Sequence, residues 1–196
     1  SKEDCKVGFL DEELFVAGYE KLFIMKVDDG SVVRSFKTEF ETNGIVSTIT
    51  TMHSNLFVTG HRDGSIQEWD TNSDNYVHTF KGHEHWVTSI AKVDDSHFIS
   101  GSADRTAKLW NFQSKDCIRT FSGHTYWVNA VMYMSTENTV LTGSSDSSIK
   151  VWSLNEIASD VVIGENTTSQ EENAEEVTNS DLERGTTEAR AEVSNT

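Results

Sequence analysis

The sequence predicts an all-β protein built from tandem, four-stranded antiparallel units. Three observations lead to this prediction. Landmark residues recur every 41 to 42 positions, apolar residues alternate with a period of two, and helical patterns are almost absent. A repeat of this length with period-two patterning accommodates four short strands joined by turns.

Three aligned segments define the repeat. They are LFVTGHRDGSIQEWD (56–70), FISGSADRTAKLWN (98–111) and VLTGSSDSSIKVWS (140–153). Gly, Asp and Trp keep the same places in each, so that Trp69, Trp110 and Trp152 are 41 and then 42 residues apart. A Gly-His motif repeats in phase with them in FKGHEHWV (80–87) and FSGHTYWV (121–128).

Turn-forming residues divide each repeat into strands a, b, c and d. In one repeat, β-prone runs at 87–93, 97–100, 107–110 and 117–121 are separated by short polar segments rich in Asp and Ser. A degenerate earlier copy is LFVAGYEKLFIMKV (14–27), in which Met25 takes the Trp place. The expected units span residues 5–37, 45–80, 86–121 and 127–163, the last with a weak outer strand at 159–163.

The period, with Gly-His near its start and Trp near its end, resembles the WD-repeat β-propeller family. The resemblance covers about residues 5–163 and implies a propeller of which four blades are visible. Members of the family most often have about seven blades, so we expect a larger ring. The chain is a fragment, closes with a second copy, or finds its missing blades on another chain. Of these, we favour an N-terminally incomplete chain.

The resemblance also implies a structural hydrogen-bonded network in each blade, formed by the Gly-His histidine, a strand b hydroxyl, the Asp of the b–c turn and the strand c Trp. The matching residues are His83, Ser100, Asp104 and Trp110 in the third unit, and His124, Thr142, Asp146 and Trp152 in the fourth. The second unit keeps Thr59, Asp63 and Trp69, but its preceding linker FKTEFETNGIV has no His. The first unit lacks the His, the Asp and the Trp, so we expect the first two units to be held mainly by apolar packing and to be softer.

Two chemical alternatives use the same residues. His83, Ser100 and Asp104 have the residue types of a catalytic triad, but the set recurs with the repeat and no GxSxG nucleophile elbow is present. His83 and His85 suggest zinc, but their spacing is unusual for a structural site and no Cys pair accompanies them. We expect no enzyme activity, no metal and no cofactor.

Charge and composition restrict the partners. The net charge of −16 argues against direct nucleic-acid binding and against docking on an anionic membrane. The sequence has no apolar run long enough to span a membrane and no signal-peptide pattern, and Cys5 and Cys117 are isolated, so we expect an intracellular protein of the cytoplasm or nucleus. Residues 164–196, with a net charge of −7 and no aromatic residues, are expected to be an acidic, disordered tail.

The resemblance implies a scaffold that binds partner proteins or peptides through propeller end loops, in a multiprotein complex. The alternative is a substrate-receptor subunit of a ubiquitin-ligase-type complex that recognises acidic or phosphorylated segments. Such receptors place Arg two residues before the strand c Trp, whereas Gln67, Lys108 and Lys150 stand there in this chain. The periodic Trp86 and Trp127 are interpreted as inter-blade packing. Because d–a linkers and b–c turns share one propeller end, the expected partner-binding residues are Arg62, Glu84, His85, Arg105, Thr125 and Tyr126.

Overall fold

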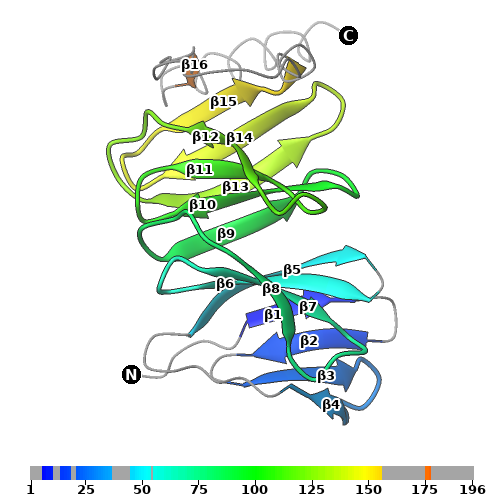
Figure 1. Ribbon diagram of the computed structural model, residues 1–196. Coiled ribbons are helices and arrows are strands. Elements are labelled where there is room, and N and C mark those ends of the chain that lie inside the picture. Colours follow the sequence, from blue (N-terminus) through cyan, green and yellow to red (C-terminus); the bar gives the residue numbers. More distant parts are fainter. Residues whose placement is uncertain are drawn as a thin grey trace, which may run out of the picture.

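The computed structural model describes residues 6–10, 14–18, 21–36, 45–53, 55–155 and 175–177. Within these ranges sixteen β-strands form four antiparallel sheets of four strands each (Figure 1). The all-β prediction is therefore confirmed. The described ranges hold no helix with the length and hydropathy that crossing a membrane requires.

Each sheet contains consecutive strands in chain order. The first comprises β1 (Lys6–Phe9), β2 (Leu14–Gly18), β3 (Leu22–Lys26) and β4 (Val32–Ser35). The second comprises β5 (Val46–His53), β6 (Leu56–His61), β7 (Ile66–Asp70) and β8 (Tyr76–Phe80). The third comprises β9 (Val87–Lys92), β10 (His97–Ser102), β11 (Ala107–Asn111) and β12 (Cys117–Phe121). The fourth comprises β13 (Val128–Met134), β14 (Thr139–Ser144), β15 (Ile149–Ser153) and β16 (Glu175–Val177).

The outer strand of the fourth sheet comes from the acidic C-terminal segment. In β16, Val177 pairs with Ile149 and Glu176 with Lys150 of β15. The outer strand expected at 159–163 lies outside the described residues, as does most of segment 164–196. The structure therefore assigns this edge position to residues farther along the chain than the sequence suggested.

The four sheets follow one another like the blades of a propeller. The first strands β1, β5, β9 and β13 adjoin in that order, and each sheet extends outward from them. Figure 1 shows the first and the fourth sheets at opposite ends of this series. The faces that meet between neighbouring sheets form the core.

Within the described part of the chain, three apolar clusters fill the spaces between successive sheets. Each contains a strand c Trp, and Trp69 and Trp110 each stack on a strand b Phe. The ring centroids of Phe57 and Trp69 are 6.1 Å apart and the ring planes are inclined at 7°. Phe98 and Trp110 form an equivalent pair, with a centroid distance of 6.1 Å and an interplanar angle of 15°. The Trp and Phe landmarks therefore mark the same packing solution in two blades.

The strand b glycines allow neighbouring blades to approach closely. A Cβ atom at Gly60 would lie 2.6 Å from Val87 Cγ1, and a Cβ at Gly101 would lie 2.8 Å from Val128 Cγ1. In both cases the Val begins strand a of the next sheet. A larger residue would push the blades apart, which explains why Gly recurs at this place.

Candidate functional site

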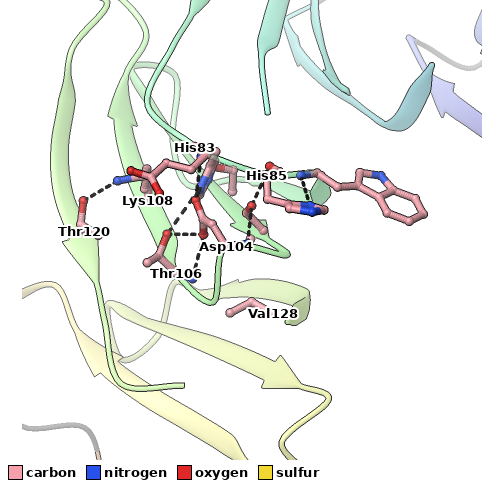
Figure 2. A network of polar contacts seen from close by, with 12 residues as sticks. His83, His85, Asp104, Thr106, Lys108, Thr120 and Val128 are labelled. Carbon is pink, nitrogen blue, oxygen red and sulfur yellow. Dashed lines mark hydrogen bonds and ion pairs between the residues drawn. The ribbon is translucent and has the colours of Figure 1, made fainter. Parts of the chain in front are cut away.

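The structure brings together the four expected network residues of the third blade. His83 Nδ1 lies 2.6 Å from Asp104 Oδ2, and His83 Nε2 lies 2.7 Å from Ser100 Oγ. Trp110 Nε1 donates to the same hydroxyl at 2.8 Å. Figure 2 shows His83 and Asp104 facing one another between the linker and the b–c turn. With the imidazole proton on Nδ1, every donor in this chain meets an acceptor.

The fourth blade repeats the arrangement with Thr in place of Ser. His124 Nδ1 lies 2.8 Å from Asp146 Oδ2, and His124 Nε2 lies 2.7 Å from Thr142 Oγ1. Trp152 Nε1 donates to that hydroxyl at 2.9 Å. Because the geometry recurs in successive blades, a common structural demand explains it.

The two carboxyls of these networks are held ionised. Burial raises the pKa of Asp104, but hydrogen bonds from His83 and Thr106 outweigh it, so the pKa lies well below its usual range. Burial likewise raises the pKa of Asp146, and bonds from the Ser148 hydroxyl and the Thr125 N–H lower it further than burial raises it. Both groups act as fixed acceptors at neutral pH.

The second blade builds its network differently from the expectation. No histidine reaches it from the preceding linker within the described residues; instead His61, in β6 itself, places Nε2 2.8 Å from Thr59 Oγ1. Trp69 Nε1 donates to the same hydroxyl at 2.8 Å. Asp63 is exposed and accepts bonds from Ser65 within its own turn. Residues two apart on a strand share a face, which is why His61 replaces the missing imidazole.

The third-blade set does not have the access that a catalytic triad needs. Ser100 is fully buried, and its hydroxyl already receives the Trp110 indole N–H. A substrate carbonyl has no path to this oxygen in the arrangement observed. The geometry therefore fits a structural network rather than a nucleophile.

The linkers before strand a and the b–c turns meet at one end of the third and fourth blades. Ala103 N donates to Trp86 O at 2.8 Å, and Ser145 N donates to Trp127 O at 2.9 Å. The Ser102 hydroxyl adds a bond to His85 O at 2.9 Å. These bonds place the candidate binding residues on a well-supported backbone.

Five side chains at this end form a continuous surface across the second, third and fourth blades, which we name the aromatic ledge. It consists of Arg62, His85, Trp86, Tyr126 and Trp127. The Arg62 guanidinium lies 4.7 Å from the Trp86 ring centroid, and Trp86 meets Trp127 edge-on at 6.3 Å. The Trp127 ring also stacks on the Tyr126 ring, with the centroids 5.7 Å apart, and contacts the His85 ring, with the centroids 6.2 Å apart. Tyr126 is 53% exposed and Trp127 38% exposed, so aromatic surface remains open to a partner.

The ledge contains two residues that sequence reasoning left out of the binding set. Trp86 and Trp127 do touch between blades, as the packing interpretation predicts. Their rings also join Arg62, His85 and Tyr126 into one surface. Their recurrence beside the Gly-His motif was a signal for this position.

The remaining three candidates lie at the same end but outside the ledge contacts. Glu84 and Thr125 are exposed, and their backbone N–H groups donate to Asp104 and Asp146 at 3.2 and 3.0 Å. Arg105 is exposed at a turn position with φ of 74°.

Comparison with known families identifies the repeats. The family described as "WD domain, G-beta repeat" matches residues 74–111 and 115–153. These two segments of the chain are repeats of the WD-repeat family. No curated protein matched the chain. WD repeats generally mediate protein–protein interaction, and WD propeller domains are typically non-catalytic.

The opposite end of the WD repeats holds a different polar contact. Glu68, buried on strand c of the second blade, receives the Lys115 ammonium of the third blade at 2.5 Å. That ammonium also lies 4.4 Å from the Phe112 ring centroid. The pair joins two blades and leaves Lys115 engaged in the fold. Among the described residues, no group of three or more His, Cys, Asp or Glu side chains is placed to hold a metal ion.

Proposed function

We propose that this WD-repeat chain is a non-catalytic scaffold that binds a partner protein or peptide through the aromatic ledge, inside the cell. The observation that carries the proposal is the joining of Arg62, Trp86, Trp127 and Tyr126 in one partly exposed surface. Trp, Tyr and Arg are the residue types that most often dominate the energy of protein interfaces. An exposed free thiol such as that of Cys117 is compatible with a reducing compartment.

Preorganisation supports this assignment. Four of the ledge residues stand on linkers whose carbonyl groups accept bonds from the b–c turns, and Arg62 stands in a b–c turn itself. Aromatic side chains with two rotatable torsions lose little entropy on binding, and a fixed backbone loses almost none. The ledge therefore offers large contact area at low entropic cost.

A second candidate is the recognition of acidic or phosphorylated segments, as in a ubiquitin-ligase substrate receptor. The exposed guanidinium of Arg105, at the same end as the ledge, favours it because Arg binds phosphate in a bidentate manner. Arg62 contributes less freely, since its guanidinium covers Trp86. Lys108, two residues before a strand c Trp, donates to Thr120 Oγ1 at 3.0 Å.

The proposal is tested with peptides selected against the full chain from a displayed random library. Affinities of the selected peptides are then measured for Tyr126→Ala, Trp127→Ala and, as a matched control, Tyr76→Ala. Tyr76 is an exposed aromatic residue on the outer strand β8, away from the ledge. Loss of a central aromatic anchor costs about 2 kcal/mol or more, which is a drop in affinity of roughly 30-fold.

Two results separate the candidates. Binding that survives both ledge substitutions but falls with Tyr76→Ala would place the interface elsewhere and reject the ledge. Each selected peptide is also measured with and without a phosphorylated Ser. A gain on phosphorylation that Arg105→Glu abolishes, while Tyr126→Ala leaves it intact, supports the receptor of phosphorylated segments instead.

A further inference from the structure

A cavity of about 140 Å³ lies between the third and fourth blades, at the blade end opposite the aromatic ledge. Its apolar wall is formed by Val93, Leu109 and Ile118 of the third blade and by Leu154 of the fourth. Leu109 and Leu154 are buried, whereas Ile118 is 40% exposed on β12, so the apolar wall reaches solvent. An apolar cavity of roughly 150 Å³ can hold a benzene molecule, so this one has room for a single aliphatic side chain.

Polar groups at the a–b turn of the third blade line the same cavity and are held in place by hydrogen bonds. Asp94 accepts from the Ser96 N–H at 2.6 Å, and both of its carboxylate oxygens lie 2.9 Å from His97 Nδ1. Burial raises the pKa of Asp94, but bonds from His97 and the Ser96 N–H outweigh it, so the pKa lies below its usual value. The Asp94 side chain is 55% exposed. A fixed negative charge therefore stands beside the apolar wall, within reach of solvent.

The junction between the second and third blades shows what the equivalent space accepts. Glu68 and Phe112 occupy there the places of Leu109 and Leu154, as the strand pairing and the a–b turn bonds show. Lys115 enters this space, and its ammonium lies 2.5 Å from Glu68 Oε2 and 4.4 Å from the Phe112 ring centroid. An aliphatic stem with a cation at its tip, matched by a carboxylate, is therefore the occupant that the fold itself uses at this place.

Two differences leave room at the later junction. Leu154 is smaller than Phe112, whose place it takes. The Tyr133 hydroxyl donates within its own blade at 3.0 Å, whereas the equivalent Lys92 reaches across the preceding junction to Met52 O at 2.6 Å. These described side chains therefore account for the unfilled space.

We propose that this cavity receives one branched aliphatic side chain, of the size of Leu or Ile, from a partner protein segment that carries Lys or Arg beside it. The volume and the apolar wall select the aliphatic group, because Leu109 replaces the carboxylate that Glu68 presents at the preceding junction. The Asp94 carboxylate selects the cation outside the cavity. The site lies at the blade end opposite the ledge, so it goes beyond the proposed ledge function and can be occupied together with it.

Titration of the full 196-residue chain with the capped dipeptide acetyl-Leu-Arg-amide, followed by amide chemical shifts in NMR spectra, tests the proposal. The signals of Val93, His97, Leu109 and Ile118 are expected to move, with the roughly millimolar affinity that suits so small a ligand. Acetyl-Gly-Arg-amide has no side chain for the cavity and is expected to bind roughly tenfold more weakly or not at all. Acetyl-Leu-Glu-amide places a like charge beside Asp94 and is also expected to bind more weakly.

Three variants of the chain identify the site. Leu154→Phe installs the residue that the third blade carries at the equivalent place, and by filling the cavity it is expected to weaken binding of the Leu-Arg probe roughly tenfold or more. Asp94→Asn keeps an oxygen for the Ser96 N–H and removes the charge, for an expected loss of about twofold to fivefold. Val77→Phe, which adds the same ring at an exposed position of β8, is the matched control and is expected to leave binding unchanged.

The probes and the variants together decide the outcome. Unmoved signals at the lining residues, equal affinities for the Leu-Arg and Gly-Arg probes, or undiminished binding to Leu154→Phe would each overturn the proposal. Far-UV circular dichroism verifies that each variant is folded, and the comparison of probes on the wild type requires no variant. Library peptides whose binding depends on Tyr126 are expected to bind Leu154→Phe normally, so failure of this site and failure of the ledge are distinguishable.

Discussion

Replacing Asp104 by Ala tests the energetic role of the third-blade network. The Asp104 carboxylate accepts from His83 Nδ1 at 2.6 Å, and its second oxygen accepts from Thr106 N at 2.9 Å and Thr106 Oγ1 at 2.6 Å. The His83 side chain is fully buried, so its Nδ1–H loses its acceptor where water cannot replace it. A nearby oxygen, Thr106 Oγ1, is 3.5 Å from Nδ1 and is a weak substitute.

An unsatisfied buried donor costs about 1–3 kcal/mol, and we place Asp104→Ala at roughly 2–3 kcal/mol because a charged acceptor is removed. Asp63→Ala in the second blade is the matched control. Its carboxylate is exposed and, among the described residues, accepts from Ser65 within its own turn, so we expect less than about 1 kcal/mol. Urea unfolding followed by Trp fluorescence measures both values. Equal losses for the two variants would refute the reasoning.

Three further changes probe the rest of the fold. His61→Ala should cost about 1–3 kcal/mol in urea unfolding, since the buried Thr59–Trp69 bond loses its third member. In a double-mutant cycle, Glu68→Ala and Lys115→Ala should show coupling of about 1–3 kcal/mol; additive losses would show that the pair contributes no interaction energy. The folded-state pKa values of Asp104 and Asp146 are lowered, so their stabilisation is complete above the unfolded pKa of about 4 and is lost as pH falls below it. Melting temperatures from pH 6 to pH 2 should therefore fall less steeply for a variant carrying Asn at both positions.

Much of the fold could be predicted because the blades that keep the repeat landmarks meet the same physical demand. A Gly on strand b, a Trp on strand c and an Asp in the b–c turn solve one packing problem, so they recur at a fixed spacing. The networks around His83 and His124 follow from this recurrence and have the expected partners. Because equivalent positions recur within one chain, a single sequence shows which residues are retained at each position, as a set of related sequences would.

The departures from the repeat were not predictable in the same way. His61 completes the second-blade network from within strand b, at a position that Ser102 and Ser144 occupy in the next blades. Glu68 is a buried acid where those blades have Leu109 and Val151, and only Lys115, 47 residues away, explains it. In each case one unusual residue is compensated by another residue that contacts it only in the folded chain. The repeat period therefore does not predict either contact.

The networks and the aromatic ledge are physically connected, which governs how binding experiments are interpreted. Asp104 accepts the backbone N–H of Glu84, and Asp146 accepts that of Thr125, so each carboxylate holds the linker that carries ledge side chains. Truncating Asp104 is therefore expected to weaken binding by loosening the linker, without any direct contact to a partner. Tyr126→Ala removes contact surface and leaves these bonds in place, because Tyr126 accepts from the Ser144 hydroxyl through its backbone carbonyl, which Ala retains. A loss of affinity in Tyr126→Ala with unchanged stability consequently reports on the interface itself, whereas a joint loss in Asp104→Ala reports on the support beneath it.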